Sequence, residues 1–311
     1  MARLLVWITV PLAALLLAGG GHAAKPGRGG SFVDLPKLAS SNIGSAHVTI
    51  WLPPGYGRGK KRYGVVYMQD AENLFFLKKS NFNKVWAADK SVLRLVANKA
   101  IEPVIIVGIY SPGADRARTY LPQRLYESLT PGLKAEIDPL LKGRMQSDAY
   151  LRFLVSELKP IIDMRYRTLA DRDHTAIMGS SMGALISLYA IAEYPGVFGL
   201  AACVSTHWPL VNPLLSDSRR GELRAAWDQY LTDHLGPPNG RRIWFDHGDQ
   251  TLDGFYGPWQ TAADVTLMRI GWQPQRDFET RSYPGAAHEE NAWAARLDEI
   301  FGWLLGPHVN D

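Results

Sequence analysis

The sequence contains very little cysteine, with one residue, Cys203, among 311. A lone cysteine excludes a disulfide within the chain, so the fold has to depend on its apolar core. Cys203 lies in the apolar run from Leu200 to Val204, and burial in such surroundings suppresses the reactive thiolate. We therefore interpret Cys203 as a small core residue and not as a nucleophile.

The chain also lacks a strong excess of charge of either sign. Lys and Arg number 34 against 30 Asp and Glu, which gives a formal net charge of +4. The basic clusters, Lys25 to Arg28 and Arg58 to Arg62, lie among glycines, and no recognised nucleic-acid-binding motif accompanies them. We expect no nucleic-acid partner.

The N-terminal apolar run is too short to cross a bilayer. It extends from Leu4 to Leu17, follows Met1-Ala2-Arg3, and precedes the small residues of Gly19 to Ala24. A charged start, a short apolar centre and a small-residue exit are typical of a secretory signal peptide. We predict that residues 1–24 are a signal peptide, that residues 25–311 form one domain without a stable membrane span, and that the protein is exported, either to the periplasm or into the medium.

Recognised metal-binding patterns are missing as well. The segment from Asp246 to Asp253 gathers three aspartates and His247, but it contains neither a calcium-binding loop nor an HExxH pattern. The chain has no internal repeats and no low-complexity tract. These absences favour a single folded domain that needs no metal and no cofactor.

One short stretch is informative for what it contains, because Gly179-Ser180-Ser181-Met182-Gly183 fits the Gly-x-Ser-x-Gly pattern. Residues 174–178 are typical of a short buried strand, and residues 184–194 of an apolar helix that ends before Pro195-Gly196. In a sharp turn between the two, side chains at the glycine positions would collide with the neighbouring strand and helix. Ser181 has glycine two residues away on both sides, which makes it the candidate nucleophile.

Strand and helix signals alternate along the chain after a flexible segment at 25–31. Expected strands lie at 46–52, 63–68, 102–110, 174–178, 200–204, 242–246 and 277–283, and expected helices at 86–98, 148–164, 184–194, 222–235, 256–271 and 289–305. This alternation predicts an α/β fold with a mainly parallel central sheet and helices on both faces. Residues 111–146 have mixed signals and many turn residues, and we expect a lid or an insertion there.

A serine hydroxyl becomes a good nucleophile when a base accepts its proton and a third group orients that base. In serine hydrolases with this turn, an acid and then a histidine follow the serine along the chain, with the histidine after the last strand. His288 has that position and is the expected base, whereas His207 and His247 precede the last strand. Asp249 and Asp253 both follow the strand at 242–246, and the residues alone leave the choice between them open.

The oxyanion that forms during attack is expected to need two backbone N–H donors. Met182 would open the helix after the turn, where its free N–H and the positive end of the helix dipole face the reaction centre. The loop Gln69 to Asn73 follows the strand at 63–68, and Ala71 is our candidate for the second donor. Candidates for the substrate pocket are Asp70, His207, Trp208 and Trp293.

With these residues in place, the chain resembles the esterase D or enterochelin-esterase-like group of α/β-hydrolases, which includes feruloyl esterases and mycolyltransferases. The stretches that carry the resemblance are 65–75, 103–109, 118–122, 179–183, 195–199 and 285–293. The resemblance implies a single α/β-hydrolase catalytic domain with Ser181 as nucleophile and His288 as base. It favours Asp253 as the acid, because Leu252-Asp253 followed by an aromatic resembles the pattern of the family. The chain departs from the family at Gln69-Asp70-Ala71, where His-Asp-Gly is common, and at Ala184, where a second glycine is common.

These expectations combine into an exported serine esterase that hydrolyses a carboxylic ester through a Ser-His-Asp triad and an acyl-enzyme. One alternative is an acyltransferase of the mycolyltransferase kind on the same fold. Another is a non-catalytic protein that holds a glycan or lipid on Trp208, Trp259 and Trp293. The expected substrate is a small-molecule, polysaccharide or siderophore ester, and the sequence predicts neither its identity nor the oligomeric state.

Overall fold

The computed structural model describes residues 29–210, 215 and 217–307, which form an eight-stranded sheet with helices around it. The strands lie in the spatial order β1-β2-β4-β3-β5-β6-β7-β8. Their bounds are β1 Ser31–Ser40, β2 Gly44–Leu52, β3 Gly64–Met68, β4 Val104–Ile109, β5 Thr175–Ser180, β6 Leu200–Val204, β7 Arg242–Gln250 and β8 Phe278–Ala287. Strands β1 and β2 are antiparallel to their neighbours, and all pairs from β4 to β8 are parallel. The prediction of a mainly parallel sheet is confirmed, while the predicted signal peptide lies outside the described residues.

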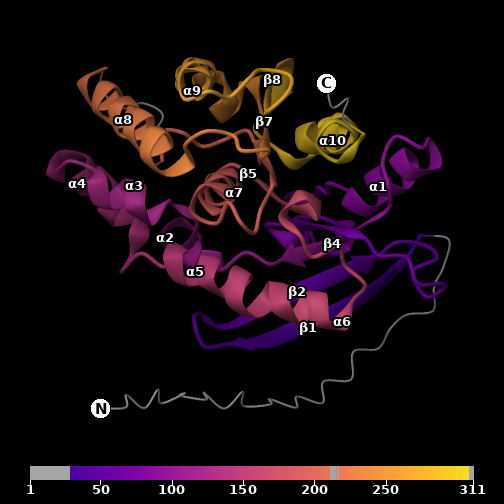
Figure 1. The fold of residues 1–311 in the computed structure, drawn as a ribbon. Helices are drawn as coiled ribbons and strands as arrows, with labels where there is room; N and C mark the ends of the chain where they lie inside the picture. Colours follow the sequence, from indigo (N-terminus) through magenta and orange to yellow (C-terminus); the bar gives the residue numbers. More distant parts are fainter. Residues whose placement is uncertain (1–28, 211–214, 216, 308–311) are drawn as a thin grey trace, which may run out of the picture.

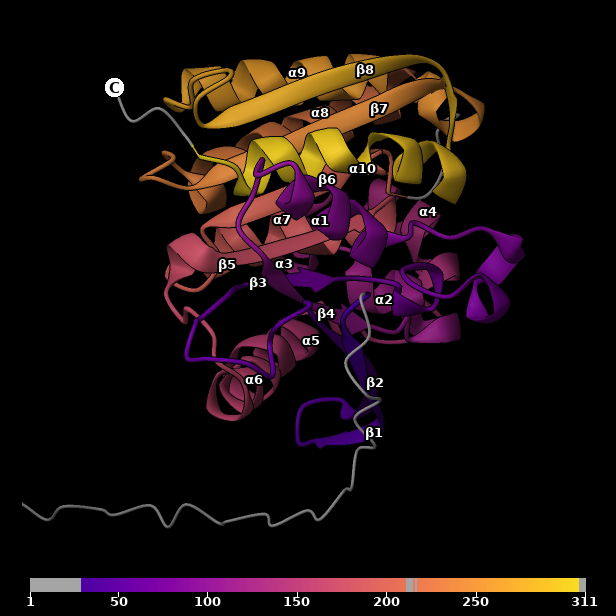
Figure 2. The ribbon, with the colours of Figure 1, turned by 90° about the vertical axis from the view of Figure 1, so that its right-hand side faces the viewer.

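Helices cover both faces of the sheet, as predicted (Figures 1 and 2). Their bounds are α1 Ala88–Ala97, α2 Arg116–Tyr120, α3 Gln123–Ser128, α4 Pro131–Leu141, α5 Ser147–Phe153, α6 Lys159–Arg165, α7 Met182–Glu193, α8 Asp217–Tyr230, α9 Gly257–Arg269 and α10 Glu290–Leu305. The apolar residues of α1 and α10 form one buried cluster with one face of the sheet, and those of α2 to α9 form another with the opposite face. Within the part of the chain that the structure describes, no helix is both long and apolar enough to cross a membrane.

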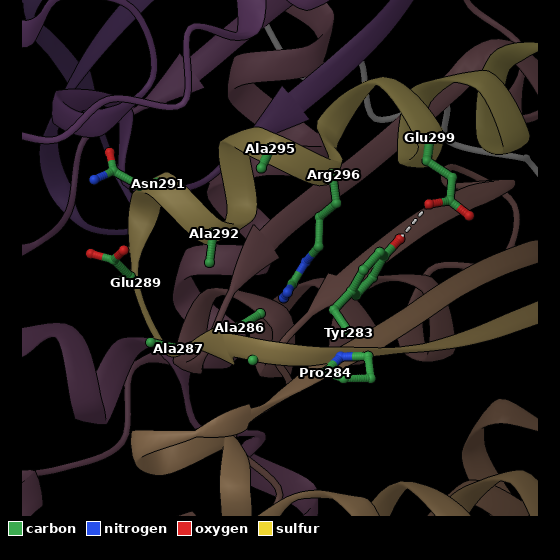
Figure 3. A pocket seen from close by; sticks show the side chains of 11 residues that line it. Tyr283, Pro284, Ala286, Ala287, Glu289, Asn291, Ala292, Ala295, Arg296 and Glu299 are labelled. Atoms are coloured by element: carbon green, nitrogen blue, oxygen red, sulfur yellow. Dashed lines mark hydrogen bonds between the residues drawn. The ribbon is translucent and has the colours of Figure 1, made fainter.

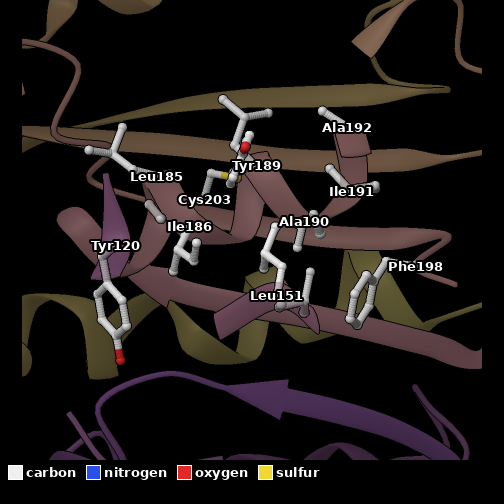
Figure 4. Close-up of a cluster of buried hydrophobic side chains, with 14 of the residues drawn as sticks. Tyr120, Leu151, Leu185, Ile186, Tyr189, Ala190, Ile191, Ala192, Phe198 and Cys203 are labelled. Atoms are coloured by element: carbon white, nitrogen blue, oxygen red, sulfur yellow. The ribbon is translucent and has the colours of Figure 1, made fainter. Parts of the chain in front are cut away.

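Helix α7 lies between the sheet and the outer helices, which is why its sequence is apolar on all sides (Figure 4). Its residues from Gly183 to Ala192 are all buried. Cys203 on β6 belongs to the same cluster and is fully buried, and this burial raises the pKa of its thiol. The interpretation of Cys203 as a core residue is therefore confirmed.

Two strands extend further than the sequence predicts. Strand β7 continues through Asp249 to Gln250, and β8 continues to Ala287, immediately before His288. The pair stays in contact across a register shift between Gly248 and Gln250, where a side chain at Gly248 would meet the Ala286 carbonyl oxygen at 2.0 Å. Asp249 therefore lies on a strand, and His288 follows a strand directly.

The segment 111–146, predicted as a lid or an insertion, contains α2, α3 and α4. Leu125 on α3 and Leu133 and Ile137 on α4 are buried in the core, so these helices are packed against the body of the domain. The start of the segment, Ser111 and Arg116, reaches the cleft described below.

Candidate active site

The turn after β5 has the strained geometry that the sequence predicts. Ser181 adopts φ 58° and ψ −121°, and α7 begins at Met182. A Cβ at Gly179 would lie 2.7 Å from the Gly183 carbonyl oxygen, and one at Gly183 would lie 3.1 Å from a carboxylate oxygen of Asp70. The expectation that a larger side chain would collide here is confirmed at Gly179, whereas at Gly183 the space is tight. The backbone of the serine is held at the carboxyl end of the sheet.

His288 and Asp253 are joined by a short hydrogen bond. The distance between His288 Nδ1 and Asp253 Oδ1 is 2.6 Å, and the second carboxylate oxygen accepts from the Gly248 N–H at 2.6 Å and from the Ser205 hydroxyl at 2.7 Å. Asp253 lies in the short 3-10 helix η8, Thr251–Phe255, and is 1% exposed. Burial alone would raise the pKa of Asp253, but the hydrogen bonds from His288 and Ser205 outweigh it and lower the pKa.

Asp249, the alternative acid, lies elsewhere. Its side chain is exposed and accepts hydrogen bonds from the Gly285 N–H at 2.8 Å and from the Gln250 amide at 2.8 Å. Neither of these partners is among the groups that donate to Asp253. The structure brings His288 together with Asp253 and not with Asp249.

Ser181 and His288 both line a cleft of about 530 Å³. Asp70 and Trp293 from the predicted pocket residues also line it. Its full lining is Gln69, Asp70, Glu72, Asn73, Asn81, Phe82, Lys84, Trp86, Ser111, Arg116, Ser180, Ser181, His288, Glu289, Glu290 and Trp293. The candidate nucleophile and base therefore share one solvent-accessible space.

The two candidate oxyanion donors lie directly beside cleft residues, although neither lines the cleft itself. Met182 is the first residue of α7, and Ala71 is the first residue of the 3-10 helix η1, Ala71–Asn73. At the first position of a helix, a backbone N–H has no carbonyl within the helix to bind. Asp70, in the left-handed region at φ 56°, directs the chain into η1.

An ion pair that the sequence did not predict joins these two segments. Arg116 donates from Nε to Asp70 Oδ1 at 3.0 Å and from Nη2 to Asp70 Oδ2 at 2.8 Å. The same Nη2 lies 3.4 Å from the carbonyl oxygen of Ser180, in the turn. Arg116 lies two residues before the Arg118-Thr-Tyr-Leu-Pro stretch that carries the family resemblance, which is the one sequence signal for it.

The other pocket candidates, His207 and Trp208, are buried and do not line the cleft. The His207 N–H lies 3.4 Å from the Ser181 carbonyl oxygen, and its Nδ1 is 2.5 Å from the Tyr256 hydroxyl. Burial is the main cause that lowers the pKa of His207 to about 3. Trp208 is 1% exposed in the core and donates its indole N–H to Gln260 at 3.0 Å. His207 thus contacts the backbone of the turn through its own N–H, and Trp208 is a packing residue of the core.

The outer part of the cleft carries several charged side chains. Lys84 forms an ion pair with Glu289, and Asn73 donates to Glu290 at 3.2 Å. Burial raises the pKa values of Glu72 and Glu290. Among the described residues, no group of three or more His, Cys, Asp or Glu side chains is placed to hold a metal ion.

With this geometry in view, comparison with known proteins places the chain in a family. A family model described as "Putative esterase" matches residues 40–304, most of the chain. The chain belongs to this esterase family, which groups it with the enterobactin-esterase-like and feruloyl-esterase-like α/β-hydrolases. The resemblance found in the sequence is confirmed.

A relative of known sequence is only distantly similar to the chain. The chain is 22% identical over 173 residues to the uncharacterised protein YbbA of Bacillus subtilis, a match that covers 55% of this chain and 61% of YbbA. The chain thus spans about three fifths of the length of that relative.

Two solved structures share the fold of the chain. An IroE-like serine hydrolase from Shewanella oneidensis superimposes with a TM-score of 0.64, at 20% identity, over 85% of this chain and 77% of that one. A mutant feruloyl esterase module from Clostridium thermocellum, complexed with sinapinate, superimposes with a TM-score of 0.59, at 14% identity, over 91% of each chain. At these identities the likeness shows the α/β-hydrolase fold, which confirms the predicted fold class.

Proposed function

We propose that this member of the esterase family is a serine carboxylic-ester hydrolase in which Ser181 is the nucleophile, His288 the base and Asp253 the acid. The observation that carries the proposal is the hydrogen bond of 2.6 Å between His288 Nδ1 and the buried carboxylate of Asp253, at the edge of a cleft that Ser181 also lines. Because Nδ1 is bound to Asp253, the other ring nitrogen, Nε2, is the one that serves the serine.

In the proposed reaction, Ser181 attacks the ester carbonyl while His288 Nε2 accepts the serine proton and then passes it to the leaving alcohol. Asp253 holds the imidazole in the useful tautomer and stabilises the imidazolium. The N–H groups of Met182 and Ala71 bind the oxyanion. Water then attacks the acyl-enzyme with His288 as base, so that the cycle uses no cofactor.

The N-terminal residues 1–24 are proposed as a signal peptide, which would deliver the enzyme to the periplasm or the medium. The absence of cysteine pairs is compatible with either compartment. Mass determination of the exported protein tests this part independently, since an N-terminus at residue 24 or 25 is expected and an intact Met1 in the purified protein would contradict it.

The test of the catalytic proposal is Ser181→Ala, assayed on a p-nitrophenyl ester. Loss of the nucleophile should lower kcat by about 10⁴-fold or more while the fold is retained. Labelling of the parent by a fluorophosphonate probe, and its loss in the variant, gives a second readout. Ser180→Ala is the matched control, because Ser180 lines the same cleft one residue earlier. Activity near the parental level in Ser181→Ala would overturn the proposal.

The nature of the ester is proposed at the level of class only, as a carboxylic ester of a small molecule, a polysaccharide or a siderophore. The likeness to a feruloyl esterase module bound to sinapinate makes aromatic acyl esters the first substrates to test. A panel of feruloyl, acetyl and longer acyl esters, with and without an alcohol acceptor, separates hydrolysis from acyl transfer. The tryptophans on which a purely binding protein would depend are 1%, 4% and 5% exposed at Trp208, Trp259 and Trp293, so they offer no open platform for a glycan.

A further inference from the structure

The hydroxyl group of Ser205 lies at the centre of a buried network beneath the candidate acid. Ser205 follows β6 directly and is completely buried. Its Oγ is 2.7 Å from Asp253 Oδ2, 2.9 Å from Trp293 Nε1 and 2.7 Å from Arg296 Nη2. Three polar groups from η8 and α10 thus meet at one oxygen atom.

The donors and acceptors in this network leave one arrangement for the Ser205 proton. An indole N–H and a guanidinium N–H are donors only, so Trp293 and Arg296 occupy the two acceptor positions of the hydroxyl. The single hydroxyl hydrogen therefore points to Asp253. Since the same carboxylate oxygen also accepts from the Gly248 N–H at 2.6 Å, the network matches an ionised Asp253 and not a protonated one.

A second buried acid fixes the position of the arginine. Arg296 Nη2 is 2.6 Å from Asp246 Oδ1, and both side chains are almost fully buried. Asp246 in turn accepts from the Ser205 backbone N–H at 3.0 Å and from the Trp244 indole at 2.8 Å. Asp246 therefore holds both the backbone of Ser205 and the guanidinium that orients its hydroxyl.

Figure 3 shows how Arg296 reaches this position. Its side chain extends from α10 toward β8, beside the ring of Tyr283, in the wall of a cavity of about 580 Å³. The guanidinium carbon lies 4.8 Å from the centre of the Tyr283 ring, whose hydroxyl donates to Glu299 at 2.7 Å. The arginine is thus held by packing as well as by charge.

Ser205 also has a backbone conformation that ordinary packing does not require. Its φ is 44°, in the left-handed region, where a non-glycine residue costs about 1 to 3 kcal/mol. Strain of this kind persists where the surroundings specify it, and it concentrates at functional sites. The partner Trp293 also contacts the base directly, because its ring lies edge-on to the His288 ring at 5.1 Å.

We infer that Ser205 is a positioning residue of the reaction, whose hydroxyl holds Asp253 in place as a carboxylate while Trp293 and Arg296 fix the direction in which it donates. The inference rests on the proposed serine-esterase function, because it concerns the acid of that triad. Ser205 acts through Asp253 and touches no reacting atom itself.

The groups that face the His288–Asp253 pair set what a pH profile reports. Arg296 and Asp246 lie on the buried side of the pair, next to Ser205. Tyr256 packs edge-on against the His288 ring, and His207 is hydrogen-bonded to Tyr256. Glu290, with Lys84 and Glu289, faces the pair from the cleft. His207 has a pKa of about 3, so it is neutral through the range in which the base of a serine hydrolase titrates.

The test compares Ser205→Ala with the matched variant Thr206→Ala. Thr206 is the next residue, is equally buried, and donates its hydroxyl to the Cys203 carbonyl oxygen at 3.0 Å, away from the acid. Loss of a hydrogen bond to an ionised group should lower kcat about 10- to 100-fold in Ser205→Ala, with KM close to that of the parent. The acid limb of kcat/KM should move to higher pH, because a carboxylate with one donor fewer stabilises the imidazolium more strongly.

Thr206→Ala should lose thermal stability to a similar extent but keep the parental kcat and acid limb. Parental kcat and an unmoved acid limb in Ser205→Ala would overturn the role of Ser205, and so would equal kinetic losses in both variants. If circular dichroism shows that Ser205→Ala does not fold, Ser205→Gly takes its place, since glycine accepts φ 44° without strain and also lacks the hydroxyl. Activity retained in Ser181→Ala overturns the proposed function itself, so the two failures are distinguishable.

Discussion

The two sides of the candidate site differ in how deeply their polar groups are buried. On the acid side, each carboxylate oxygen of Asp253 has a donor, and Asp253, Ser205 and Asp246 are at most 1% exposed. On the cleft side, Phe82 is 80% exposed, and Lys84 and Glu289 meet at the surface. The proposed base is therefore held by a buried network, whereas the proposed substrate would meet a partly solvated rim.

Burial explains why both carboxylates of the acid side need hydrogen-bond partners. A buried polar group without a partner costs about 1 to 3 kcal/mol, and an unpaired charge costs more. Asp253 and Asp246 avoid this cost through their contacts with His288, Ser205 and Arg296. The Lys84–Glu289 pair at the rim of the cleft is partly solvated, so it contributes little stability.

Among the variants that test the difference between the two sides, Asp253→Asn is expected to change kcat most. The amide cannot stabilise an imidazolium, and its NH₂ would face groups that donate to the native carboxylate, so kcat should fall about 10²- to 10⁴-fold. Asp249→Asn is the control, since Asp249 is exposed and bonds only to its strand neighbours, and it should retain parental activity on a p-nitrophenyl ester. Equal losses in the two variants would remove Asp253 from its proposed role.

A smaller effect is expected from Arg116→Gln, on the boundary between the two sides. Arg116 joins Asp70, before the candidate donor Ala71, to the carbonyl of Ser180 in the turn. Its loss should loosen the two oxyanion donors relative to each other and lower kcat about 10- to 100-fold, with a smaller change in KM.

Arg94→Gln is a matched control for that change. Arg94 also makes a two-pronged ion pair, with Asp298 at 2.9 Å and 2.7 Å, but on the surface between α1 and α10. Exposed pairs contribute about 0 to 1 kcal/mol, so this variant should keep kcat and lose little stability in urea unfolding. Parental kinetics in Arg116→Gln would show that the cleft pair is likewise only a surface contact.

Local pattern and chain order determine the nucleophile turn and the position of the proposed base, and both are predictable from the sequence. The glycines around Ser181 identify it as the candidate nucleophile, because the sharp turn requires them. The position of His288 after the last strand identifies it as the candidate base, because the parallel topology fixes the order of the two residues. Apart from the family resemblance, the sequence does not decide whether Asp249 or Asp253 is the acid. The choice depends on how far β7 extends, and the strand continues through Asp249 beyond its predicted end at residue 246.

The residues that sequence reasoning missed act through contacts between distant segments. Ser205 meets Trp293 across 88 residues, and Arg116 meets Asp70 across 46. No local pattern encodes such a pair. Strand β1 was missed for another reason, since Pro36 interrupts its pattern and the pairing shifts register between Leu35 and Leu38. Proline is tolerated there because β1 is an edge strand.

The smallest effect, and the sharpest test of the open side, is expected from Phe82→Ala. Phe82 lines the cleft while 80% of its surface is exposed, which gives it no role in the core. Loss of a ring that packs on an aromatic acyl group should raise KM for methyl ferulate about two- to tenfold, with kcat unchanged. Met164→Ala, which removes a side chain that is 76% exposed on α6, should change neither constant. An unchanged KM for feruloyl and acetyl esters alike would contradict contact between Phe82 and the substrate. The substrate would then bind on the inner wall beside Trp293, and Phe82 would not belong to the surface that meets it.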